Sequence, residues 1–129
     1  MVLVDTSIWI DFFQNNDSFH TITLEGLIKD NNRAVVCGVV LREVLQGIKD
    51  NTSYELTKER LLKLPFLDTN KETYIYASSL YRTLRRKGVT IPSIDTTKAA
   101  IAVLNNIPLF TKDEHYKTIA RFRFTCTSF

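Results

Sequence analysis

Short apolar runs that alternate with longer amphipathic stretches are the feature that most limits the fold of this chain. The runs Val-Leu-Val at 2–4, Ala-Val-Val-Cys at 34–37 and Pro-Leu-Phe at 108–110 are continuously apolar, as strands buried on both faces are. Between them, apolar residues recur every three or four positions, which is typical of helices. The alternation predicts an α/β fold in which a central, mostly parallel β-sheet is flanked by α-helices.

The helical periodicity can be placed along the chain. We expect helices at about 8–13, 22–28, 39–48, 52–63, 72–87, 93–105 and 115–120, and a last strand at 122–126. The segment 93–105 is rich in Ala and apolar on nearly all sides, which predicts a helix buried among other elements. On the helix at 72–87, one face that we expect to be core carries Tyr74, Ala77, Tyr81 and Leu84.

Length and composition narrow the class of protein. The 129 residues predict a single domain, 1–129, with its own core. The 17 basic and 14 acidic residues give a net charge of +3, which mildly favours an anionic partner. Cys37 and Cys126 form neither a metal-binding cluster nor a disulfide framework. No apolar run is long enough to span a membrane and no export signal is evident, so we expect a cytoplasmic protein without membrane contact.

Candidate chemistry lies where the strands end. Asp5 follows the first strand and Asp113 follows the strand at 108–110, and ligands of open parallel sheets bind beyond the carboxyl ends of the strands. Glu43 and Asp95 lie on helices that flank these strands. One crevice can therefore collect four carboxylates from distant parts of the chain.

Crowded carboxylates repel one another unless a cation lies between them. Oxygen ligands without a Cys or His cluster favour Mg²⁺ or Mn²⁺ over zinc. Such ions lower the pKa of a bound water and neutralise charge on a phosphodiester, so the reaction needs no side-chain nucleophile. The four acids therefore indicate metal-dependent phosphate chemistry.

Each acid taken alone also has a structural explanation. Asp5 and Asp113 are suited to cap the helices that follow them. Glu43 can be a solvated helix residue, and Asp95 a first-turn acid favoured by the helix dipole. The four acids indicate a site only when they are taken together, because they are expected at one edge of the sheet and follow one another in a particular order along the chain.

Four segments carry a more specific pattern. They are MVLVDTSIWID at 1–11, VVLREVLQG at 39–47, IPSID at 91–95 followed by AAIA at 99–102, and IPLFTKD at 107–113. In this order they resemble PIN-domain proteins, especially the VapC toxins of bacterial and archaeal VapBC toxin–antitoxin pairs. The resemblance spans nearly the whole chain and implies a PIN-like fold.

The resemblance also implies an activity and a set of site residues. It implies a ribonuclease toxin using Mg²⁺ or Mn²⁺, with Asp5, Glu43 and Asp95 as principal ligands and Asp113 as a fourth, often through water. Thr6 and Thr111 match positions that support the acids by hydrogen bonding. The implied partners are an RNA substrate, a cognate antitoxin and a second copy of the chain in a homodimer.

Lys98 departs from this pattern, because similar toxins usually carry an aliphatic residue three positions after the third acid. At that spacing Lys98 and Asp95 share a helix face. The ammonium can pair with Asp95 and compete with metal, contact RNA phosphate, or extend away from a partly buried position. If Lys98 lowers metal affinity, activity is weak at physiological magnesium and Lys98→Ile increases it.

Other candidates carry less weight. His115, two residues after Asp113, can touch metal or substrate, but the absence of a second nearby His favours a surface or structural role. An aspartyl-phosphate phosphatase also places a nucleophilic Asp after its first strand, but it needs a second Asp where this chain has Ser7. A degenerate PIN domain that binds RNA or protein without cleavage is the non-enzymatic alternative, and Lys98 is its support.

Overall fold

Four short strands form a fully parallel sheet in this computed structural model, which describes residues 1–120. The strand order is β3-β2-β1-β4, with β1 at Val2–Val4, β2 at Ala34–Cys37, β3 at Phe66–Leu67 and β4 at Leu109–Phe110. Leu3 pairs with Val35 on one side and with Leu109 on the other. The prediction of an α/β fold with a mostly parallel sheet is confirmed.

The seven helices in the described residues follow the predicted periodicity closely. They are α1 (Thr6–Phe13), α2 (Phe19–Lys29), α3 (Gly38–Gln46), α4 (Asn51–Leu62), α5 (Lys71–Arg86), α6 (Ser93–Leu104) and α7 (His115–Ala120). The strand expected at 122–126 lies outside the described residues. Within residues 1–120, no helix has both the length and the apolar character needed to cross a membrane.

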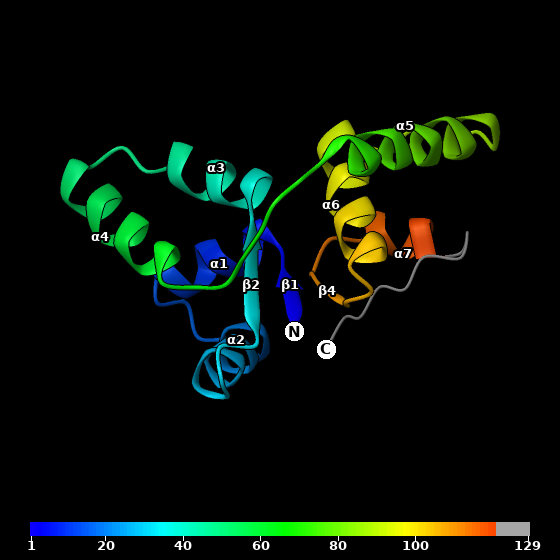
Figure 1. The fold of residues 1–129 in the computed structure, drawn as a ribbon. Coiled ribbons are helices and arrows are strands. Elements are labelled where there is room, and N and C mark those ends of the chain that lie inside the picture. The colour runs from blue at the N-terminus through cyan, green and yellow to red at the C-terminus, as the bar shows by residue number, and fades with distance from the viewer. Residues whose placement is uncertain (121–129) are drawn as a thin grey trace.

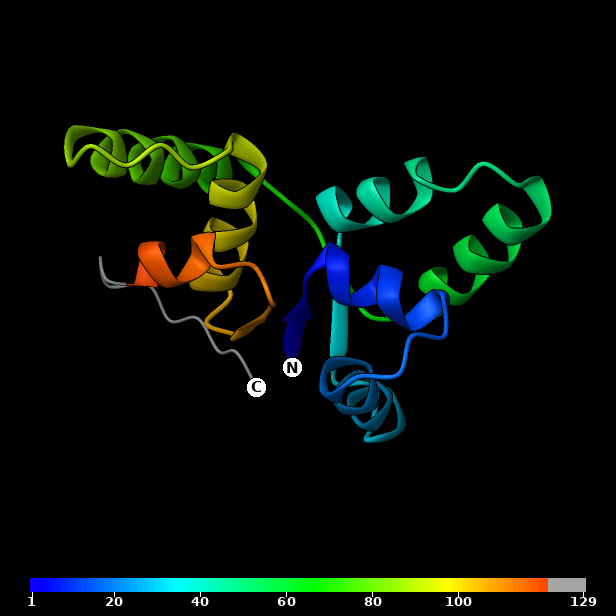
Figure 2. The same cartoon turned by 180° about the vertical axis from the view of Figure 1, so that it is seen from behind.

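The helices are divided between the two sides of the strands (Figure 1). α1, α3 and α4 lie on one side, whereas α5, α6 and α7 lie on the other, and the reverse view in Figure 2 shows the same division. α2 lies at the end of the sheet where β1 begins. A long connection that contains β3 joins the two groups of helices.

The core is built around the two central strands. Every residue of β1 and β2 is buried, and Trp9, Leu24 and Phe110 are among the fully enclosed side chains that pack against them. The Ala-rich centre of α6 is also fully buried, as its composition predicts. On α5, Ala77 and Leu84 are buried, but Tyr74 is 57% exposed, so its expected core position is wrong.

The strand order determines which edge of the sheet can hold a site. The chain passes from β1 to β2 in one direction, and β4 then adds on the opposite side of β1. Such a reversal is the point at which open parallel sheets bind ligands, beyond the carboxyl ends of the strands. The residues that follow β1 and β4 therefore meet at the edge where the sequence predicts the site.

Candidate active site

Asp5 joins the ends of β1 and β4. It is 4% exposed and directly precedes α1, where its Oδ1 accepts a hydrogen bond of 2.8 Å from the Thr6 amide. Its Oδ2 accepts a 2.7 Å hydrogen bond from the hydroxyl of Thr111, which follows β4. Asp5 therefore caps α1 and also lies at the edge where β1 and β4 end, so the two explanations of its position are compatible.

Glu43 reaches the same place from α3. Its Oε1 accepts a 2.7 Å hydrogen bond from the Thr6 hydroxyl, and its side chain is 25% exposed. Glu43 is thus turned toward the end of β1 rather than being an isolated, solvated helix residue. Thr6 and Thr111 each bond one of the acids, as the resemblance implies for these positions.

Lys98 extends from α6 to the first two acids. Its Nζ lies 2.8 Å from Asp5 Oδ1 and 2.6 Å from Glu43 Oε1, and it donates a longer 3.3 Å hydrogen bond to Thr6 Oγ1. Burial disfavours the ammonium, but the two carboxylates outweigh this cost and raise the pKa of Lys98 above its usual value. The ammonium is therefore a fixed positive charge in the site.

These contacts decide between the roles considered for Lys98. An ammonium has three N–H donors: Asp5 and Thr6 accept hydrogen bonds from Lys98, and Glu43 forms an ion pair with the same nitrogen. The side chain is only 3% exposed, so it does not extend to solvent, and its carboxylate partners are Asp5 and Glu43 rather than Asp95. Its ion pairs are thus formed with two acids that helical spacing alone does not indicate.

Asp5, Glu43 and Lys98 form one half of the site. Asp95 belongs to the second half and lies in the first turn of α6. Its Oδ1 accepts a 3.3 Å hydrogen bond from the Tyr116 hydroxyl, and its Oδ2 lies 3.0 Å from His115 Nδ1. Burial, together with the negative charges of Asp5, Asp95 and Asp113, raises the pKa of Tyr116. All three acids therefore act on one buried hydroxyl, which links the two halves.

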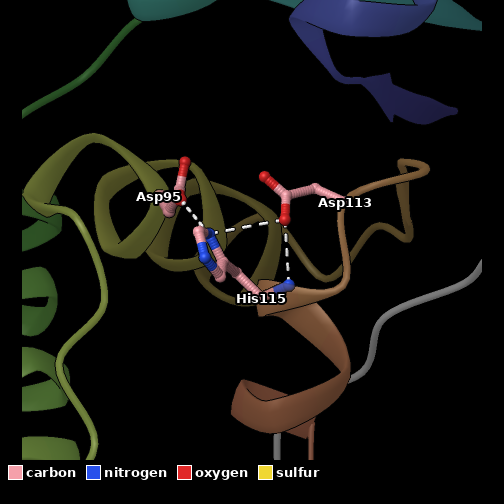
Figure 3. A group of neighbouring side chains, drawn as sticks. All are labelled: Asp95, Asp113 and His115. Carbon is pink, nitrogen blue, oxygen red and sulfur yellow. Dashed lines mark hydrogen bonds and ion pairs between the residues drawn. The ribbon is translucent and has the colours of Figure 1, made fainter.

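Asp113 completes this half from the loop after β4. Its Oδ1 accepts a 2.9 Å hydrogen bond from the His115 amide and lies 3.4 Å from His115 Nδ1. Its own amide donates to Thr111 Oγ1 at 3.0 Å. Asp113 thus accepts a hydrogen bond from the first amide of α7, and Figure 3 shows its carboxylate directed toward the His115 ring.

Sequence reasoning assigned His115 a surface or structural role and did not identify Tyr116. The His115 side chain is 49% exposed, but its ring faces both Asp95 and Asp113 (Figure 3). Its hydrogen bond to Asp95 is the main cause that raises its pKa, and the charges of both acids add to the effect. One feature of the sequence could have indicated this role for His115. It is the first residue of α7, and its amide donates a hydrogen bond to Asp113.

The two halves differ in their suitability for a metal ion. Ligand atoms of Asp95, Asp113 and His115 lie within 4.8 Å of one another, close enough to contact one divalent ion. Carboxylates suit Mg²⁺ and Mn²⁺, and an imidazole nitrogen adds a ligand that transition metals accept. The Asp5–Glu43 half has oxygen donors of the right kind, but the Lys98 ammonium lies between them.

Comparisons with known proteins identify similar sequences over nearly the whole chain. The family model described as PIN domain matches residues 2–122. The chain is 31% identical to VapC ribonuclease Mb1587 of Mycobacterium bovis, over 94% of this chain and 92% of that protein. It is 25% identical to Ribonuclease VapC1 of Methanocaldococcus jannaschii, over 94% and 82% of the two chains.

Solved structures show the same fold at lower sequence identity. VapBC2 from Rickettsia felis, bound to a promoter DNA fragment, matches with a TM-score of 0.81 and 22% identity over 99% of this chain and 98% of that chain. DNA-bound VapBC from Salmonella typhimurium also gives a TM-score of 0.81, with 17% identity over 98% and 96% of the chains.

Proposed function

The chain belongs to the PIN-domain family, and from this premise we propose that it is a metal-dependent endoribonuclease, the toxin of a type II toxin–antitoxin pair. One observation carries the proposal: acids from four distant segments gather at the carboxyl ends of β1 and β4. The similarity to proteins named VapC ribonucleases supports RNA as the substrate. Cellular RNA as the target makes the cytoplasm the proposed location.

The proposed site residues are Asp5, Glu43, Asp95 and Asp113, with Mg²⁺ or Mn²⁺ as the cofactor. Asp95 and Asp113, with His115 beside them, would hold the ion. When bound, the ion would polarise the scissile phosphate and lower the pKa of a water molecule. We assign the attack to this water molecule. The site contains acids and an ammonium, and with an activated water no side-chain nucleophile is needed.

The other residues would keep these acids oriented. Thr111 holds Asp5 Oδ2, and Thr6 holds Glu43, so both carboxylates are fixed before substrate arrives. The Tyr116 hydroxyl stays protonated and donates to Asp95. A preformed site of this kind binds a phosphate and an ion without reorganising at the moment of reaction.

The proposed protein partners are an antitoxin and a second copy of this chain. A groove between α1, α3 and α4 is lined by apolar side chains that include Ile10, Phe13, Val44 and Ile48. An apolar helix of an antitoxin would fit such a groove. The exposed Tyr74 and Ile75 on α5 support a homodimer contact on the other side of the molecule.

The decisive experiment incubates the purified protein with structured RNAs in Mg²⁺ or Mn²⁺. We expect cleavage that chelator abolishes and that Asp5→Asn or Asp95→Asn lowers by about a hundredfold or more. Asp17→Asn is the matched control, because it makes the same chemical change in the exposed loop between α1 and α2. Cleavage that persists in chelator, or that is equal in all three variants, contradicts the proposal.

A PIN domain that binds RNA without cleaving it is the second candidate function. The specific observation in its favour is the ion pairing of Lys98 with Asp5 and Glu43, because an ammonium there competes with metal. The same assay separates the two candidates when RNA binding is measured in parallel. Binding without metal-dependent cleavage supports the non-enzymatic alternative.

A further inference from the structure

Lys98 occupies the position in the site where a cation would bridge Asp5 and Glu43. The two carboxylates come from segments 38 positions apart in the chain, and each lies within 2.8 Å of the same nitrogen. Without a positive charge between them they would repel each other in a poorly hydrated place. The ammonium therefore performs the neutralisation that a metal ion performs in a purely acidic site.

We propose that Lys98 is a built-in cation that replaces a second metal ion, so that the centre holds a single divalent ion against Asp95, Asp113 and His115. The inference deepens the proposed function and rests on it, because it assumes a metal centre at this edge of the sheet. The proposal gives the two halves of the site different roles. One half keeps a permanent charge, and the other binds an exchangeable ion.

Burial and hydrogen bonding argue that the ammonium is not easily displaced. Lys98 is 3% exposed, donates hydrogen bonds to Asp5 and Thr6, and forms an ion pair with Glu43. An ion entering between Asp5 and Glu43 would have to leave the ammonium buried without these partners, and an unpaired buried charge is strongly destabilising. The Asp5–Glu43 half thus already holds its cation, the Lys98 ammonium.

The other half has the opposite properties. His115 and Asp113 are partly open to solvent, and neither forms a contact with a lysine among the described interactions of residues 1–120. Their ligand atoms and those of Asp95 lie within 4.8 Å of one another. A divalent ion can therefore enter from solvent and contact three side chains without displacing a buried cation.

The oxygens around the Lys98 nitrogen also limit what Lys98 does toward RNA. A lysine that contacts a phosphate needs an accessible N–H group, and here three oxygens of the protein already lie within 3.3 Å of the buried nitrogen. Lys98 would therefore act on a bound phosphate through its charge rather than through a hydrogen bond. It is a positioning residue for Asp5 and Glu43.

The first test counts bound Mn²⁺ from the electron paramagnetic resonance signal of the free ion. We expect one ion per chain for the wild type and, for Lys98→Met, either a second ion or a roughly tenfold lower Kd, because two carboxylates become available. Lys29→Met is the matched control, since it removes the same charge from an exposed ion pair with Glu25. Two ions on the wild type, or identical stoichiometry and Kd in Lys98→Met, overturn the proposal.

The second test needs no variant, so it stands even if Lys98→Met fails to fold. In protein labelled with ¹⁵N at lysine, the buried Lys98 ammonium should exchange slowly with water and give its own NMR signal, assigned through bonds along the side chain. We expect this signal to persist when Mg²⁺ saturates the protein. Its loss, or a shift to the position of solvated lysines, would mean that the metal displaces the ammonium and that the proposal is wrong.

The results also separate this proposal from the proposed function. A chain that cleaves RNA but binds two ions retains the nuclease function and loses the role given to Lys98. A chain that binds one ion with an immobile Lys98, yet leaves RNA intact, retains that role and contradicts the ribonuclease.

Discussion

The Nζ of Lys98 lies 2.8 Å from Oδ1 of Asp5, although 93 positions separate the two residues in the chain. The contact ties the buried helix α6 to the end of β1, and both side chains are almost fully enclosed. A buried ion pair of this kind affects the stability of the fold as well as the chemistry of the site.

The first prediction concerns this pair in the metal-free protein. Lys98→Met leaves Asp5 and Glu43 without their cation, and breaking a buried pair in this way lowers the free energy of unfolding by roughly 3–5 kcal/mol. Urea denaturation measures the change. Asp5→Asn in the same chain should restore part of the loss, whereas the control Lys29→Met should change stability by at most about 1 kcal/mol. A Lys98→Met chain as stable as the wild type would show that the pair is weak.

The second prediction concerns Thr111, whose hydroxyl donates to Asp5 Oδ2 and accepts from the Asp113 amide. Thr111→Val keeps the shape but removes both bonds, so we expect a loss of about 2 kcal/mol in the free energy of unfolding. RNA cleavage should also fall by about tenfold or more, because Asp5 is no longer held. Thr23→Val is the control, since the exposed Thr23 hydroxyl bonds only to a carbonyl of its own helix. Equal effects of the two substitutions would contradict the role of Thr111.

The third prediction concerns the titration of His115 without metal. Its hydrogen bond to Asp95 raises its pKa above the ordinary value of 6.5. A raised pKa in the folded state means that the protonated ring stabilises the fold. This contribution is complete below pH 6.5 and is lost as the pH rises through the folded-state pKa.

NMR titration of the His115 ring tests this directly, and urea denaturation across the same pH range tests the stability. Asp95→Asn should lower the pKa of His115, because it removes the carboxylate that favours the charged ring. A His115 pKa at or below 6.5 in the wild type would show that the ring does not interact with Asp95 in solution.

The sequence was sufficient to predict the architecture and the edge at which the acids meet. Buried parallel strands are recognisable as continuous apolar runs, and the carboxyl ends of parallel strands lie together, so Asp5 and Asp113 could be assigned to one edge. The two-residue strand β3 could not be predicted, because it is too short to show a period. Only its pairing with β2 makes it a strand.

Side-chain partners were harder to predict for a physical reason. Helical spacing indicates which residues share a face, and it paired Lys98 with Asp95, but a long side chain is free to extend across that face to another element. Lys98 turns instead to Asp5 and Glu43, which come from other segments. The contact of His115 with Asp95 could not be predicted either, because this acid on α6 is 20 positions away and contributes no local pattern.

The last prediction concerns how cleavage depends on metal concentration. If the Lys98 ammonium replaces one ion, the wild-type rate should rise with about the first power of Mn²⁺ concentration, whereas Lys98→Met should approach the second power, because two ions must then bind. At low Mn²⁺ the variant should be slower than the wild type, and at saturation it should come within about tenfold of it. Single-turnover cleavage of one RNA over a range of Mn²⁺ concentrations measures both effects, with Lys29→Met as the control for loss of charge. The same first-order dependence in the wild type and in Lys98→Met would mean that the ammonium does not act in place of an ion. A higher rate for the variant at every concentration would instead mean that Lys98 inhibits the site by competing with the metal that catalysis requires.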